Sequence, residues 1–291
     1  MSARDRTRSR LVSGKAGGMQ VLEFVERLFL TWALYSCIGW IWETGLSIVV
    51  RRRFVDRGVL IGPLCPIYGF GALLVLFLLN DETNPVALFL SSGVVACTLE
   101  YISSYVIEKL HHIRLWDYSN KPFNINGRVY LNGFIAFGAG ATLVKLFVQP
   151  WFMGIVRQWT PLALHIVCGV IAVLLIVDAS LTAAYSWSFD TKLKRISEDV
   201  NAVHAEQVAN LDEKVVTASE RLEERRRAVL DSHVSHTLNW QQRRLMQAFP
   251  AMRSVRDNAI IDQLRESMEG LRSGRRTRDT QHGSDESRVD K

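Results

Sequence analysis

Five long apolar stretches constrain the fold of this chain more than any other feature of its sequence. A helix needs about 20 apolar residues, at about 1.5 Å each, to cross the hydrocarbon layer of a bilayer. Stretches of about that length lie at residues 28–50, 59–79, 85–107, 131–149 and 161–185. The sequence therefore predicts an all-α fold, a polytopic transmembrane helix bundle with about five spans.

The last third of the chain has a different composition. Nearly all the long apolar runs end before residue 188, and the residues that follow are densely charged. Such a change implies two regions with different solvents. We predict an N-terminal basic tail and interfacial segment at 1–27, a transmembrane domain at 28–187, a cytoplasmic helical region at 188–272 and a disordered tail at 273–291.

The placement of Lys and Arg predicts the orientation of the spans. The connection "RRRFVDR", the connection from Lys109 to Arg128 and the segment "KLKR" are basic, whereas "NDETN" has no basic residue. Basic connections stay in the cytoplasm, so the C-terminal region is predicted to be cytoplasmic. The arginine-rich start, "MSARDRTRSR", favours the opposite orientation, so the side of the N-terminus is left open.

The net charge predicts a membrane partner. A formal charge of +6 suits attraction to an anionic inner leaflet, and no recognised nucleic-acid motif accompanies it. We therefore expect a multi-pass protein of the cell membrane, with the lipid bilayer as a partner and no nucleic acid.

An internal repeat is visible at an offset of 69 positions. The stretch "FVDRGVLIGPLCPIYGFGALLV", from Phe54, aligns without a gap with "FNINGRVYLNGFIAFGAGATLV", from Phe123. The shared glycines are Gly58 with Gly127, Gly69 with Gly138, and Gly71 with Gly140. This pattern predicts a 2+2 parallel repeat, in which each unit is a helix, a basic connection and a returning helix. The alternative is the composition that all spanning helices share.

Two acidic residues lie within predicted spans. Glu43 precedes Arg51 by eight positions and Glu100 precedes Lys109 by nine, so both lie about 12 Å inside the basic ends of their helices. An ionised acid costs about 2.5–3.5 kcal/mol at the centre of a membrane, so such groups face protein, water or a partner. We predict an intramembrane polar site that binds a cation or a proton, with Asp178 as a further candidate. Alternatively, each acid makes local hydrogen bonds that tie helices together.

The second predicted span begins with an unusual pattern, "GVLIGPLCPIYGFG". Proline has no N–H donor, and four glycines flank the two prolines, so some backbone groups there are predicted to be unpaired within the segment. A broken helix of this kind forms solute sites in transporters. The predicted segment contains Gly62, Pro63, Cys65, Pro66, Tyr68 and Gly69. The alternative is an ordinary helix with both prolines in its first turns and with Gly69 and Gly71 allowing close packing.

The connection "HHIRLWDYSNKPFNINGRVYLNG" is polar, aromatic and rich in turn residues. Asn-Gly and Lys-Pro mark turns, and aromatic side chains favour the membrane interface. We predict an ordered cytoplasmic loop that caps the polar site, formed by Trp116, Asp117, Tyr118, Asn126 and Gly127. Simple anchoring at the interface explains the same residues.

The C-terminal region has a helical apolar stripe. Apolar residues recur in steps of three and four from Leu193 through Ile196 and Val200. Such steps are typical of a coiled-coil seam and predict a homo-oligomer through the C-terminal helix. The alternative is packing against a further helix of the same tail at 245–271.

Four segments together resemble a known family. "YSCIGWIWE", "RRRFVDRGVLIGPLCPIYGFGALLV", "LEYISSYVIEKL" and "WDYSNKPFNINGRVYL" are similar to the bacterial CmpB-like type IV group of ABC-transporter permeases, over residues 27–150. The resemblance implies a multi-pass membrane protein with a role in transport. It implies no substrate, cofactor or catalytic residue.

We therefore expect a transporter permease-like component for a small solute, and not an enzyme. The sequence has no G-x-x-x-x-G-K-[ST] phosphate loop, so an ATP-driven role would need a separate ATP-binding subunit. The four cysteines lie singly, without the spacing of a metal or redox site, and we expect no metal and no cofactor. The alternative is a membrane scaffold or sensor that acts through its C-terminal helical region.

Overall fold

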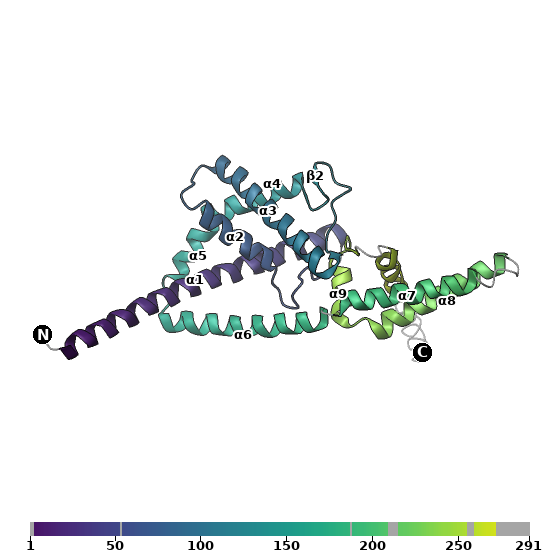
Figure 1. The fold of residues 1–291 in the computed structure, drawn as a ribbon. Coiled ribbons are helices and arrows are strands. Elements are labelled where there is room, and N and C mark those ends of the chain that lie inside the picture. Colours follow the sequence, from purple (N-terminus) through teal and green to yellow (C-terminus); the bar gives the residue numbers. More distant parts are fainter. Residues whose placement is uncertain (1–2, 53, 187, 209–214, 255–258, 272–291) are drawn as a thin grey trace, which may run out of the picture. The chain divides into compact units, whose positions relative to one another are not determined.

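The computed structural model describes residues 3–52, 54–186, 188–208, 215–254 and 259–271 (Figure 1). The chain forms two compact units. The membrane unit comprises Met1–Ser103 and Tyr118–Thr182, and the tail unit comprises Ser104–Asp117 and Ala183–Lys291. The predicted disordered tail at 273–291 lies outside the described residues.

The membrane unit is built from helices. Their bounds are α1 (Ala3–Arg51), α2 (Pro66–Leu78), α3 (Pro85–His111), α4 (Leu131–Leu143), the π-helix η1 (Val144–Val148), α5 (Gln149–Val156) and α6 (Pro161–Ser186). Both α3 and α6 extend into the tail unit. Four helical stretches in the described residues are long and apolar enough to cross a membrane: Gly18–Val50, Pro85–His111, Leu131–Val156 and Pro161–Ala202. The predicted all-α membrane fold is confirmed.

The predicted second span, at 59–79, is shorter than expected. Its helix, α2, begins only at Pro66 and has 13 residues, about 20 Å at helical rise, which is less than the hydrocarbon thickness of about 30 Å. Residues 59–65 are irregular because Pro63 cannot donate to a helical ladder. The helix of the first span is longer than the predicted span, since α1 continues through residue 27, the end of the predicted N-terminal segment.

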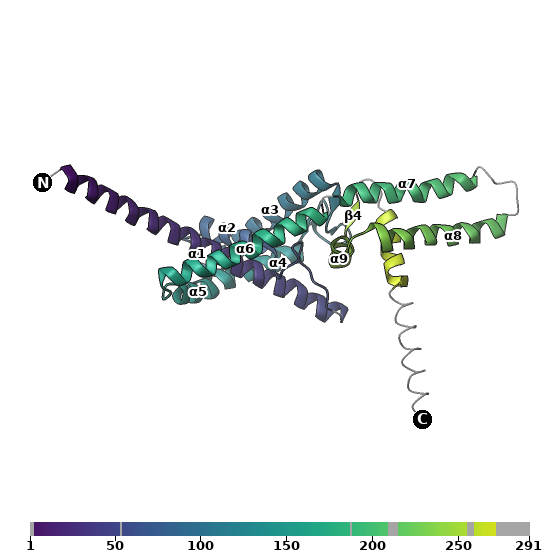
Figure 2. The same cartoon turned by 90° about the horizontal axis from the view of Figure 1, so that it is seen from below.

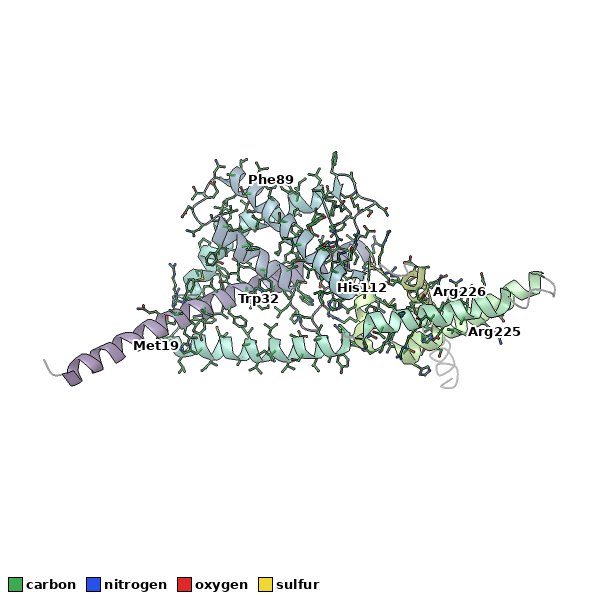
Figure 3. The ribbon with its side chains drawn as sticks, viewed as in Figure 1. Met19, Trp32, Phe89, His112, Arg225 and Arg226 are labelled. Carbon is green, nitrogen blue, oxygen red and sulfur yellow. The ribbon has the colours of Figure 1, made fainter. Side chains whose placement is uncertain are left out.

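A similar glycine contact joins the helices of each pair in the membrane unit, α1 with α2 and α3 with α4. A Cβ added to Gly69 on α2 would lie 2.5 Å from the carbonyl oxygen of Trp32 on α1. A Cβ added to Gly138 on α4 would lie 2.6 Å from the carbonyl oxygen of Phe89 on α3. Figure 3 labels Trp32 and Phe89 on their helices.

The same correspondence includes the two acids. Glu43 follows Trp32 by eleven positions, and Glu100 follows Phe89 by eleven positions. The carbonyls of Trp32 and Phe89 mark where α2 and α4 approach α1 and α3. Each acid lies eleven residues beyond its mark, so the two acids have the same place along their helices. This shared geometry supports the predicted parallel repeat of two helix pairs.

The tail unit has a hydrophobic core of its own. It contains α7 (Phe189–Val208), α8 (Val215–Ser232), the π-helix η2 (His233–Thr237), α9 (Trp240–Ala248) and helical residues 259–271. In Figures 1 and 2, α7 and α8 lie side by side. The two-residue strand β1 (Ile113–Arg114) pairs antiparallel with β4 (Arg253–Ser254). This pairing joins the connection after α3 to the C-terminal region.

The apolar stripe of α7 is buried within the tail unit. Leu193, Ile196 and Val200 are at most 4% exposed, and they belong to one core cluster with Leu230 of α8 and Leu264. Of the two alternatives that the stripe left open, packing against other helices of the same tail accounts for these residues. A self-associating coiled coil is not needed to bury them.

Candidate functional site

Glu43 on α1 receives hydrogen bonds from two other segments. The hydroxyl of Tyr68 on α2 donates to its Oε1 at 2.6 Å. The guanidinium of Arg57 donates to its Oε2 from Nη2 at 3.2 Å and from Nε at 3.4 Å. Gly39 allows this arrangement, because the ring of Tyr68 occupies the space that a Cβ at Gly39 would need. Both carboxylate oxygens of Glu43 therefore have donors.

Glu100 on α3 is more deeply buried and has fewer donors. It is 7% exposed, and the hydroxyl of Tyr118 donates to its Oε1 at 3.4 Å. Its Oε2 is buried and has no hydrogen-bond partner among the described residues. A buried carboxylate oxygen without a donor costs free energy unless a proton or a cation meets it.

Tyr118 is held by the connection between α3 and α4. Its N–H donates to the carbonyl of Gly127 at 2.7 Å, and its ring lies 4.5 Å from that of Tyr130. Between them, β2 (Asn124–Ile125) and β3 (Val129–Tyr130) form a short hairpin. Gly127 has a φ of 65°, a left-handed conformation that glycine adopts without strain, so the hairpin can close beneath Tyr118.

The two acids lie within electrostatic range of each other and of one tyrosine. Burial raises the pKa of the Tyr118 phenol well above its ordinary value, and the negative charges of Glu100 and Glu43 raise it further. The positive charge of Arg57 lowers that pKa, by less. At neutral pH, Tyr118 is therefore protonated and donates its hydroxyl to Glu100.

The sequence model of a family described as "Putative ABC-transporter type IV" matches residues 30–183, just over half of the chain. The chain belongs to this family. A search of curated proteins found no match, and a search of solved structures found none either.

The family match contains the whole cluster of Glu43, Glu100 and their tyrosines. It ends at residue 183, next to the boundary between the membrane unit and the tail unit. The match therefore covers the membrane unit of this chain from residue 30 onward, together with the connection after α3. The core of the tail unit, apart from the connection after α3, lies outside the match.

Asp178 on α6 has different partners from the two glutamates. Its carboxylate accepts the backbone N–H of Ile61 at 2.8 Å and of Gly62 at 2.9 Å, and the Thr182 hydroxyl at 3.2 Å. These are amides that the irregular segment before α2 leaves unpaired. In this family member Asp178 thus holds the segment that precedes α2.

The residues of the predicted broken-helix segment make different contacts. The N–H of Cys65 donates to the carbonyl of Ser36 at 2.9 Å, and Pro66 is the first residue of α2. Pro63 lies before the helix, so only one of the two prolines is in its first turn. Within this segment, Tyr68 is the residue whose side chain bonds to an acid of the site.

The predicted capping residues also separate. Tyr118, Asn126 and Gly127 belong to the membrane unit, where the Asn126 amide donates to the hydroxyl of Tyr101 on α3 at 2.9 Å. Trp116 and Asp117 belong to the tail unit. The carboxylate of Asp117 forms ion pairs with Arg114 at 3.6 Å and Arg253 at 3.0 Å, and these bonds fix the β1–β4 pair.

Three further charged groups of the membrane unit make contacts that the sequence did not predict. Arg57 pairs with Glu43, and its place soon after the span that carries Glu43 was the signal that could have found it. Lys145 of η1 donates to the backbone carbonyls of Leu79, Asn80 and Glu82, which follow the last turn of α2. The ammonium group of Lys145 therefore caps the C-terminal end of α2.

The third group is a further acid on α1, Glu26. Nδ1 of His165 on α6 lies 2.7 and 2.8 Å from the two carboxylate oxygens of Glu26. The predicted first span began at residue 28 and therefore excluded Glu26. Within the described residues, no group of three His, Cys, Asp or Glu is arranged to hold a metal ion.

Proposed function

We propose that this chain is a permease-like component of a membrane transport system, and that Glu43 and Glu100 bind the cationic part of a small solute or a proton. One observation supports the proposal above all others. Oε2 of Glu100 is buried, and the described residues supply no donor to it. An ionisable side chain inside a spanning helix costs free energy. Such side chains usually have a function.

The proposal also assigns a partner and an orientation. The chain has no phosphate loop, so an ATP-driven cycle would depend on a separate ATP-binding subunit. The basic connection at 51–57 favours the cytoplasm for that end of the bundle, and the same rule places the tail unit there. A homo-oligomer remains a prediction, which light scattering of the purified protein would test.

Two conservative substitutions test the site. Glu43→Gln and Glu100→Gln remove the charge and keep the shape, and each should lower uptake of, or growth on, a responsive solute at least about tenfold, which is about 1.4 kcal/mol. Glu23→Gln is the matched control, because Glu23 is also on α1 and also pairs with an arginine, Arg27. Membrane yield and melting temperature must stay unchanged in all three variants.

A scaffold or sensor is the second candidate, because the tail unit has a complete core of its own. Removing residues 190–291 would abolish the phenotype of a scaffold, while the glutamate variants would have little effect. Ile113 is part of that core, so the deletion should be combined with Ile113→Ser to avoid a newly exposed apolar side chain. Normal activity in the glutamate variants would refute the transport proposal.

A further inference from the structure

Aromatic rings lie beside both acids of the site. The ring of Tyr68 meets Phe137 edge-on at 5.9 Å between centroids, and the ring of Tyr118 lies 4.5 Å from Tyr130. Carboxylates that accept from tyrosine hydroxyls within an aromatic cluster suit organic cations, which combine a positive charge with apolar surface. Calcium and magnesium ions need about six or more oxygen ligands instead, and the described part of the chain gathers no three metal-ligating side chains.

Arg57 already places an organic cation in this environment. Its guanidinium lies within hydrogen-bonding distance of Glu43, and its charge acts on the Tyr118 phenol. The site therefore accommodates a planar, delocalised cation.

Arg57 is bound less tightly than the other donor to Glu43. Charge-assisted N–H···O bonds are usually about 2.7–2.9 Å long, whereas the two from Arg57 are 3.2 and 3.4 Å. Tyr68 donates to the same carboxylate at 2.6 Å from a helix. Arg57 lies on the irregular connection before α2, and its side chain is 23% exposed. It is therefore the exchangeable partner of Glu43.

The connection itself need not move for Arg57 to leave. Trp40 on α1 donates from Nε1 to the carboxylate of Asp56 at 2.7 Å and so fixes the residue before Arg57. A different rotamer of the Arg57 side chain would release Glu43 while Asp56 keeps its bond to Trp40, since arginine has several rotatable bonds.

We propose that the Glu43–Glu100 site binds an organic cation of the guanidinium or amine class, and that Arg57 is a tethered competitor for it. The solute donates to Oε2 of Glu100 and displaces Arg57 from Glu43. This inference rests on the proposed function and adds the class of solute and the residue that regulates access.

Equilibrium binding of radiolabelled methylguanidine tests the proposal. The full-length protein is held in phosphatidylglycerol nanodiscs, which contain no amine headgroup. Arg57→Ala should bind methylguanidine about tenfold more tightly, because the competitor that lowers the apparent affinity is gone. Arg57→Lys keeps a tethered cation and should stay near the wild type, and Glu100→Gln should bind at least about tenfold more weakly.

A matched control is present on α1, the helix that carries Glu43. Arg27 pairs with Glu23 at 3.5 Å, with side-chain exposure of 30% and 27%, close to the 23% and 28% of Arg57 and Glu43. Arg27→Ala should leave methylguanidine binding unchanged. Unchanged or weaker binding by Arg57→Ala at an unchanged melting temperature overturns the proposal, and so does equal competition by sodium or potassium ions.

A second arm identifies the source of the cation. Nanodiscs with phosphatidylethanolamine present an ammonium group, the amine member of the proposed class, on a lipid headgroup. Competition by this lipid in the wild type supports a headgroup as the ligand, and its absence supports a free solute; both agree with an organic cation. If the glutamate variants lose uptake but Arg57→Ala does not alter methylguanidine binding, this inference fails and the proposed function stands. If those variants keep uptake, the proposed function fails whatever Arg57→Ala does.

Discussion

The membrane unit exposes many more apolar side chains than helices α7, α8 and α9 of the tail unit. In the membrane unit, Ser36 and Ser92 are fully buried and Glu100 nearly so, while apolar residues such as Phe147 and Leu162 are 67% exposed. In the tail unit the fully buried side chains include Ile196, Ile261 and Leu264. The exposed residues of its α8 include Arg225, which Figure 3 labels.

This difference indicates that the two units fold in different solvents. In water, burial of apolar surface stabilises a fold by about 25 cal/mol per Å², so the apolar residues of the tail unit lie inside. Lipid removes that driving force, and small residues with close contacts then hold helices together. Gly69 and Gly138 are contacts of this second kind.

The largest effect is expected from a charge in the core of the tail unit. Ile196 is fully buried in an apolar cluster, so Ile196→Asp should destabilise the tail unit by about 4 kcal/mol or more. Limited proteolysis of the full chain in nanodiscs should then cut within 188–254 and spare the membrane unit. Arg225→Ala, on the exposed surface, is the control and should change stability by less than about 0.5 kcal/mol.

A charge on the outside of the membrane unit provides the opposite test. Leu174 on α6 is 64% exposed, so Leu174→Arg would be nearly neutral if that surface faced water. Facing lipid, the arginine should cost about 2.5–3.5 kcal/mol near the centre of the bilayer. Reduced membrane insertion of the variant is the expected result. Normal insertion and an unchanged melting temperature would show that this face does not contact lipid.

A single methyl group tests the glycine contact of α4. A Cβ at Gly138 would lie 2.6 Å from the carbonyl oxygen of Phe89, so Gly138→Ala should cost about 2 kcal/mol by overpacking. Gly140, on the same helix, has open space at its Cβ position, and Gly140→Ala should be neutral or slightly stabilising. Equal melting temperatures for the two variants in nanodiscs would contradict the close approach of α3 and α4.

Loss of the cation that caps α2 should have a smaller effect. Lys145→Met keeps most of the side-chain length but leaves the carbonyls of Leu79, Asn80 and Glu82 without this donor, at a cost of about 1.5 kcal/mol. Faster hydrogen exchange in the last turn of α2 is the measurement. Lys109→Met, at the exposed end of α3, should leave that exchange rate unchanged.

The smallest effect concerns pH and Tyr118. Its pKa is raised in the folded protein, while an unfolded tyrosine titrates near pH 10, so the unfolded chain loses this proton first. The stability that Tyr118 adds is therefore present below pH 10 and is lost as the pH rises towards the folded pKa. The stability gap between the wild type and Tyr118→Phe should narrow by about 1 kcal/mol between pH 10 and 11. A gap that stays constant would contradict the burial of this phenol.

Length and composition were enough to predict most of the membrane helices. The stretch at 85–107 became α3, Pro85–His111, and the stretch at 161–185 became most of α6. Such predictions succeed because insertion into lipid depends on summed apolarity along one segment. The stretch at 59–79 differs because the path of residues 59–65 depends on Asp178, which is more than a hundred positions away.

The candidate site was only half visible in the sequence. Counting from the basic ends of two spans gave Glu43 and Glu100 matching depths, and helical rise is regular enough for that count. That count could not predict which side chains bond to the two acids. Arg57 and Tyr118 reach the acids from irregular connections, whose paths no periodicity predicts.

By itself, the sequence determined that this protein has a helical membrane region and a charged helical tail, because apolar content and helical period are properties of single segments. Only the tertiary structure decided that the α7 stripe is buried within its own tail, that Asp178 holds the segment before α2, and that Oε2 of Glu100 is left without a donor. These outcomes depend on which distant groups meet, and a hydrogen bond is made or lost over a few tenths of an ångström that no local pattern encodes.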